Sequence, residues 1–262
     1  MKYYFDLENL RWGLGAHDIC YKNKLTGAFF SMGQVLPTHR LWHSQHGGLY
    51  QPTMTQAIKL LSAPSANMAA EDRWYTTNGQ DRMWAPAAYT ANRHAWVHVF
   101  PEACCHQSPG ETNTMRYFKW GVSRLILESD PAPEFVPMFI HGTRGIMAED
   151  RTWPRFIPRG GNKLQVMVGE PRDVDVLFGR QRDAWRRLVE KGDEESLRSG
   201  PEALRLRIEV AKAVRDEIQK LREKLGLPPD EDETAGLAET WSKEPNKRRF
   251  KSPVDGGLIN RH

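Results

Sequence analysis

The chain has 262 residues, of which 39% are hydrophobic and 27% charged, and its net charge is +4. This length can hold one large domain, and the modest positive charge favours anionic partners such as a lipid surface or a nucleic acid. The three cysteines include an adjacent pair, Cys104 and Cys105, so they do not form a disulfide framework. No apolar run approaches the roughly 18 to 20 residues that span a bilayer, and we expect any membrane contact to be interfacial.

The first part of the chain alternates short apolar segments with turns. Residues 3–11 can begin a helix, and residues 34–38 are predicted to form a short strand. Residues 52–61 are predicted to form a helix, because their apolar side chains share one helical face. Residues 63–93 are rich in Ala, Pro, Asn, Gly and Thr with little periodicity, which predicts a long surface loop.

Strand signals recur in the middle of the chain, at residues 96–100, 135–140 and 163–168. Between the first two, residues 113–128 have the pattern of a cationic amphipathic helix whose apolar side chains would face a sheet. A strand, a helix and a strand in this order predict an α/β domain with at least one parallel pair of strands.

Beyond Gly169 the chain is predicted to be helical. Residues 200–226 carry one apolar stripe with pairs of opposite charge on the exposed side, which predicts a long helix. An acidic run followed by a basic cluster predicts that residues 229–262 are mostly disordered. We therefore assign residues 1–228 to one domain, with residues 63–93 as a loop insertion.

The sequence patterns of standard catalytic and metal sites are absent. There is no Gly-x-Ser-x-Gly elbow, Walker A loop, Gly-x-Gly-x-x-Gly or His-Glu-x-x-His. His39, His43 and His46 have helical metal-ligand spacing, but no carboxylate lies among them. The run Cys104–His106 is too tightly spaced for one tetrahedral zinc. We expect neither a metal ion nor a cofactor.

A candidate binding motif follows the strand at residues 96–100. Phe100 ends that strand, Pro101 breaks it, and the carboxylate of Glu102 then emerges at a strand's carboxyl end, where α/β folds bind ligands. Such a carboxylate suits a polyol or phosphate head group whose tail lies in apolar surroundings. The alternative is that Glu102 only caps the next turn.

Three cations are candidates for the same site. Arg116 and Lys119 would sit one turn apart on the helix predicted at 113–128, and Arg40 follows the strand predicted at 34–38. An arginine can bind a phosphate through a bidentate fork, which a lysine cannot. The alternative for Arg116 and Lys119 is a solvated helix face.

Several long segments resemble the tafazzin family, particularly its fungal members. The resemblance covers roughly residues 10–225, and the matching segments are WVHVFPE (96–102), MRYFKWGVSRLI (115–126), 16–20, 29–33 through Pro37 to Arg40, 135–137 and 164–171. Tafazzins belong to the glycerolipid acyltransferase superfamily. The resemblance implies an α/β fold: a glycerolipid-acyltransferase-like sheet with flanking helices, here N-terminally truncated, plus C-terminal helices.

The resemblance also implies an activity and a place in the cell. The expected reaction moves acyl chains between phospholipids and lysophospholipids, especially to remodel cardiolipin, without coenzyme A. The expected location is the intermembrane-space side of mitochondrial membranes, with peripheral attachment, and no nucleic acid is expected as a partner. Phe100, Pro101 and Glu102 match the family's Phe-Pro-Glu-Gly block beside the bound glycerol backbone, and Gly33 and Arg40 match its second block more loosely.

Two departures from the family pattern stand out. Ala103 occupies the Gly position of the Phe-Pro-Glu-Gly block, where a positive φ or a close substrate would disfavour a methyl group. The superfamily's catalytic motif is His, four residues, then Asp, and none of the nine histidines has Asp at that spacing. We therefore name no catalytic residue and expect a truncated form of a fungal tafazzin-like enzyme. The alternative is a non-catalytic lipid-binding isoform or paralogue.

Overall fold

Three short parallel strands form the central sheet of the N-terminal half, in the order β2–β1–β5. β1 spans Trp12–Ala16, β2 spans Val35–Thr38 and β5 spans Val97–His98. The sheet confirms the predicted α/β class. The computed structural model of the chain describes residues 10–41, 43–63, 73–86, 95–103, 115–148, 157–229, 233–237, 249–251 and 258–260.

Helices connect and cover these strands. α1 (His17–Cys20) and α2 (Lys24–Met32) lead from β1 to β2, and α1 lies close to the sheet because Gly15 has no side chain. A Cβ at Gly15 would lie 2.5 Å from Val35 Cγ1 and 3.1 Å from Cys20 Sγ. α3 (Pro52–Leu61), at its predicted position, packs on one face of the sheet. There it forms a core cluster of Trp12, Leu36, Met54, Ala57, Ile58, Leu60 and Leu125.

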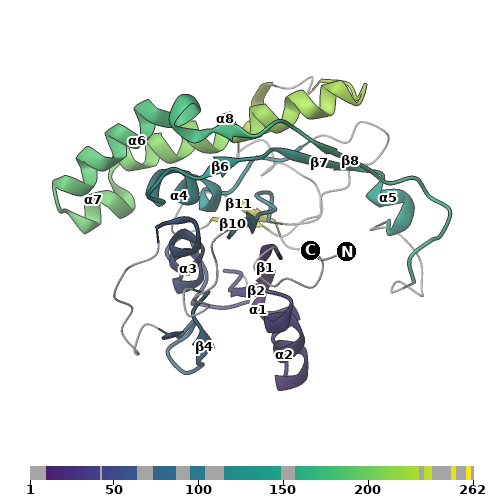
Figure 1. Cartoon of the computed structure of the whole chain (residues 1–262), viewed down its shortest axis with the longest axis horizontal. Coiled ribbons are helices and arrows are strands. Elements are labelled where there is room, and N and C mark those ends of the chain that lie inside the picture. The colour runs from purple at the N-terminus through teal and green to yellow at the C-terminus, as the bar shows by residue number, and fades with distance from the viewer. Residues whose placement is uncertain are drawn as a thin grey trace.

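α4 (Gly121–Glu128) joins the sheet to the C-terminal helices. Its Leu125 belongs to the cluster with α3, while Val122 and Ile126 pack against α6 (Val174–Glu190) and α8 (Pro201–Lys224). In Figure 1, α6, α7 (Glu194–Ser199) and α8 form the upper layer, and the parallel sheet with α3 lies below α4. Among the described residues, no helix is both long and apolar enough to span a bilayer.

The remaining strands form antiparallel pairs. The predicted strands at 135–140 and 163–168 become β7 (Met138–His141) and β8 (Gln165–Val168), which pair with each other and not with β5. The parallel pairs are instead β1 with β2 and β1 with β5. The other short elements are β6 (Glu134–Phe135) with β9 (Arg172–Asp173), α5 (Thr143–Ile146) and the 3-10 helix η5 (Glu233–Gly236).

Two segments expected to be irregular contain strands. Within the predicted loop, β3 (Trp74–Tyr75) pairs with β4 (Met83–Trp84), and the rings of Trp74 and Trp84 lie 3.6 Å apart. Within the predicted tail, β10 (Arg249–Lys251) pairs with β11 (Leu258–Asn260). The expectation of irregular structure does not hold for these strand residues, whereas residues 76–82 between β3 and β4 are irregular as expected. Residues 3–9, 64–72, 87–93 and much of 230–262 lie outside the described part of the chain.

Buried arginines hold the helical layer together. Arg182 donates hydrogen bonds to the carbonyls of Ile126 and Ser129 at the end of α4. Arg207 does the same for Leu197 and Arg198 at the end of α7. These carbonyls have no partner within their own helices, so each guanidinium satisfies a helix terminus while its own charge is hydrogen-bonded.

Candidate substrate-binding site at the carboxyl ends of the parallel strands

The carboxyl ends of the three parallel strands bring most of the predicted residues to one edge of the sheet. His17 and Asp18 follow β1, His39 and Arg40 follow β2, and the turn Phe100–Ala103 follows β5. Ligands of α/β proteins bind at this edge. We call this group of residues the strand-end site.

Arg40 is paired with Asp18. Its Nε lies 3.0 Å from Asp18 Oδ1, and its Nη2 bonds Oδ2, so the two side chains meet through two parallel hydrogen bonds. The guanidinium of Arg40 holds the pKa of the Asp18 carboxyl below its ordinary value. Asp18 therefore orients the cation that the sequence singled out. Its position in the matched segment 16–20 was the signal that could have identified it.

A hydrogen-bond network lies beside this ion pair. The ring of buried His39 contacts Thr77 Oγ1 through Nε2 at 2.8 Å, and Thr77 in turn donates to Asp81. The ring of His17 stacks on that of His39, with centroids 4.3 Å apart. Burial lowers the pKa of His39, and the neighbouring charges of His17 and His46 lower it further. A neutral imidazole therefore lies at the end of β2.

Three of these side chains are close enough to suggest a metal site. Potential ligand atoms of His17, His39 and Asp81 all lie within 4.8 Å of one another. The two imidazole rings are stacked with planes only 22° apart, so their in-plane lone pairs do not converge on one ion. The carboxylate of Asp81 already accepts hydrogen bonds from Thr76 and Thr77. We interpret the cluster as a hydrogen-bond network.

The turn after β5 presents the Phe-Pro-Glu motif. Ala103 N donates to the carbonyl of Phe100 at 3.0 Å, which closes a turn with Pro101 at its second position. Phe100 is exposed, and Glu102 Oε2 accepts a hydrogen bond from the backbone N–H of Arg116 at 3.2 Å. Glu102 thus holds a segment that lies 14 residues further along the chain.

The prediction that Arg116 and Lys119 lie on a helix is wrong. α4 begins only at Gly121, and residues 115–119 have no regular secondary structure. Their backbone bonds other segments instead: Lys119 N donates to the carbonyl of Pro101 at 2.8 Å. These tertiary hydrogen bonds replace the ones that an additional helical turn would make.

The two cations of this segment have different surroundings. Arg116 is buried, so it is not part of a solvated face. Lys119 is partly exposed, and its Nζ lies 2.6 Å from Tyr117 Oη and 4.7 Å from the centre of that ring. Of the two, Lys119 is the one placed to meet a ligand from solvent. The backbone N–H of Arg116 bonds Glu102 and that of Lys119 bonds Pro101, so both residues lie beside the turn Phe100–Ala103.

Ala103 has a φ of +56°, in the left-handed region that favours glycine. Replacing it with the family residue, Ala103→Gly, is expected to raise the free energy of unfolding by about 0.5–1 kcal/mol. Relief of the Cβ clash, worth roughly 1–2 kcal/mol, outweighs the extra backbone entropy of glycine in the unfolded chain. Chemical denaturation measures this change. Ala28→Gly is the control: Ala28 is exposed within α2, so the same change there should lower the free energy of unfolding.

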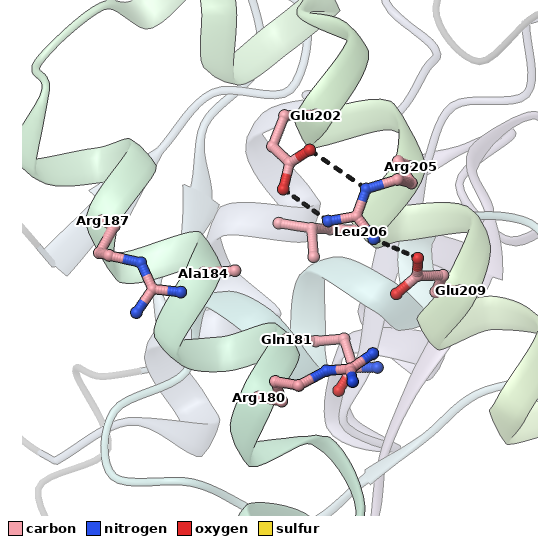
Figure 2. Close-up of a pocket in the computed structure, with 8 residues that line it drawn as sticks. All are labelled: Arg180, Gln181, Ala184, Arg187, Glu202, Arg205, Leu206 and Glu209. Atoms are coloured by element: carbon pink, nitrogen blue, oxygen red, sulfur yellow. Dashed lines mark hydrogen bonds and ion pairs between the residues drawn. The ribbon is translucent and has the colours of Figure 1, made fainter.

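A cavity of about 250 Å³ lies elsewhere, between α6 and α8. Figure 2 shows Arg205 between Glu202 and Glu209, with Arg180 and Arg187 on the facing helix. None of the residues predicted for substrate binding lines this cavity. We therefore do not include it in the strand-end site.

Comparison with known proteins identifies the family of the chain. No family model matches it. The tafazzin of Saccharomyces cerevisiae is 34% identical over 275 residues, which cover 98% of this chain and 70% of that protein. The chain belongs to the tafazzin family. The family predicted from the sequence motifs is thereby confirmed.

More distant relatives support the same family and the acyltransferase class. An N-acylphosphatidylethanolamine synthase of Arabidopsis thaliana is 29% identical over 65% of this chain, and a Drosophila melanogaster tafazzin is 28% identical over 63%. The chain spans 48% and 33% of these two proteins, so about half their length or less. By this kinship the chain is a member of an acyltransferase family, as the motifs predicted.

Proposed function

We propose that this tafazzin-family protein transfers acyl chains between phospholipids and lysophospholipids without coenzyme A, and that cardiolipin is among its substrates. We further propose that it acts as a peripheral protein on mitochondrial membranes, on the intermembrane-space side. One observation carries the proposal: the alignment with yeast tafazzin, at 34% identity, covers 98% of the chain and so includes the strand-end site.

Arg40 is assigned to the phosphate of the head group. The guanidinium has five N–H donors, and Asp18 accepts from one at Nε and one at Nη2. Other N–H groups of the fork can therefore donate to phosphate oxygens. Asp18 fixes the plane of the fork before the lipid arrives. Such preorganisation lowers the entropic cost of binding.

Glu102 and Lys119 are assigned to the glycerol part of the lipid. Glu102 Oε2 holds the Arg116 N–H, and the carboxylate has further lone pairs that can accept from a hydroxyl group. The backbone N–H of Lys119 donates to the carbonyl of Pro101, which holds this residue beside the Phe100–Ala103 turn, and its ammonium bonds the phenol oxygen of Tyr117. The exposed ring of Phe100 offers an apolar surface for the acyl chain.

In the proposed reaction, the hydroxyl oxygen of the lysophospholipid attacks the ester carbonyl of the donor phospholipid. A new ester C–O bond forms, the donor's ester C–O bond breaks, and the hydroxyl proton finally resides on the departing oxygen. The family resemblance assigns that proton transfer to a His and an Asp spaced by four residues, a pattern that this sequence does not contain. The residues of this chain are therefore assigned binding and orientation, not proton transfer.

The proposal is tested with protein expressed from its native transcript. It is incubated without coenzyme A with a phospholipid labelled in one acyl chain and with lysocardiolipin, and the lipids are separated by chromatography. We expect the label to appear in cardiolipin. When a labelled acyl-coenzyme A replaces the labelled phospholipid, we expect no label in cardiolipin. Label that stays in the donor while the protein binds the vesicles would instead indicate a lipid-binding protein without turnover.

A further inference from the structure

The helix α2 carries its apolar stripe on the outside. Leu25, Ala28, Phe29 and Met32 recur at the three- and four-residue spacing of one helical face, which in a crossover helix normally packs on the sheet. Here all four are exposed, with 81% of Leu25, 66% of Phe29 and 72% of Met32 accessible. No residue of α2 is buried.

The opposite side of α2 attaches it to the sheet. Gly27 and Phe30 are partly buried, and Gly27 faces the ring of Tyr21, whose hydroxyl donates to the carbonyl of Val35 in β2. A capping box formed by Asn23 and Thr26 fixes the start of the helix. The orientation of the exposed stripe is thus set by contacts on the other side of the helix.

Two lysines border the stripe at the start of the helix. Lys22 and Lys24 are exposed, and the first turn has no acidic residue. A cation near a helix N-terminus opposes the helix dipole, so these lysines do not stabilise α2. They do complement an anionic surface, to which exposed lysines are attracted.

We propose that the stripe Leu25, Ala28, Phe29 and Met32, with Lys22 and Lys24, inserts into the interface of an anionic phospholipid membrane. Apolar side chains on one face of a helix with lysines at its border are the pattern of interfacial membrane helices. This inference rests on the proposed function, because it supplies the surface at which that function meets its lipid substrates.

A second copy of the chain fits this face less well. A specific protein interface uses roughly 20–30 residues on each side, whereas α2 has nine residues and four exposed apolar positions. A bilayer needs no matching partner surface. α2 lies at the bottom of the view in Figure 1, away from α6 and α8, so that no helix of the described upper layer limits its approach to a membrane.

The position of α2 in the chain links this surface to the strand-end site. α2 follows Asp18 by a few residues and leads into β2, which ends beside Arg40. Both members of the ion pair therefore flank the same connection. A membrane bound along α2 would bring lipid head groups to the level of that pair.

Vesicle flotation with the full chain tests the proposal. The vesicles contain phosphatidylcholine with or without an anionic phospholipid, and the test variant is Leu25→Gln with Phe29→Gln. We expect its binding to anionic vesicles to fall roughly tenfold or more, because two large apolar side chains no longer insert. Val176→Gln on α6 is the matched control, since Val176 is 80% exposed and lies outside the stripe.

Acyl transfer from detergent-dispersed lipids separates this proposal from the proposed function, because that assay needs no bilayer. Reduced vesicle binding supports the membrane role of α2 whether or not the parent transfers acyl chains in detergent. Equal vesicle binding by parent and test variant would overturn it. The proposal would also be overturned if sedimentation showed a dimeric parent and a monomeric test variant that bind vesicles equally well.

Discussion

Glu102→Gln is expected to lower acyl transfer by roughly 10- to 100-fold while leaving the stability of the protein nearly unchanged. The amide oxygen of Gln can still accept the hydrogen bond from the Arg116 N–H. It lacks the negative charge of the carboxylate, to which we assign the binding of the glycerol hydroxyl. A hydrogen bond to a charged group contributes about 1.5–3 kcal/mol, which corresponds to this range of rates. Initial transfer rates and a denaturation curve, measured on protein from the native transcript, give both quantities.

Two further variants show which role Glu102 has. Glu102→Ala removes the charge and the acceptor together, so it should lower stability as well as transfer. Glu170→Gln changes an exposed glutamate and should alter neither. If Glu102→Gln transfers acyl chains at the parent rate and only Glu102→Ala loses stability, the carboxylate is a structural acceptor and our assignment to the substrate is wrong.

Arg215→Met is expected to lower the free energy of unfolding by roughly 2–6 kcal/mol. Buried Arg215 in α8 donates from Nε to the carbonyl of Arg116 at 3.0 Å and from Nη2 to that of Met115 at 2.8 Å. Methionine fills similar space but leaves both buried carbonyls without these donors, at about 1–3 kcal/mol for each. Urea denaturation measures the difference.

Lys212→Met is the control for Arg215, because Lys212 is exposed on the same helix and should change stability by less than about 0.5 kcal/mol. Arg215→Lys should fall between parent and Arg215→Met, since one ammonium cannot reproduce the two directed donors of the fork. Equal stability of Arg215→Met and the parent would mean that other contacts hold residues 115–116 in place.

The sequence predicted elements whose signal is local. α3 was predicted at its observed bounds, because its periodicity agrees with the face that it buries. The helix expected at 113–128 begins eight residues late, since residues 115–119 exchange helical hydrogen bonds for bonds to Pro101, Glu102 and Arg215. β1 was not predicted, because two of its five residues are glycines that leave little apolar pattern.

Residues of the candidate site were predictable from the sequence only where they form one continuous motif. Phe100, Pro101 and Glu102 form a continuous motif, and the break at Pro101 was expected, although β5 already ends at His98. The partners His39, Thr77 and Asp81 come from separate segments whose proximity exists only in the folded chain. The burial of Arg116 was missed for a similar reason, because a charged residue at helical spacing normally indicates a solvated face.

The hydrogen bonds of Arg215 also affect how natural variants of this protein should be interpreted. α8 belongs to the upper layer in Figure 1, and a substitution there would ordinarily be classed as remote from the site. Yet the guanidinium of Arg215 bonds the carbonyls of Met115 and Arg116, and the N–H of Arg116 bonds the carboxylate of Glu102. Substitutions along residues 201–224 should therefore be ranked by whether they displace Arg215, not by their distance from the lipid.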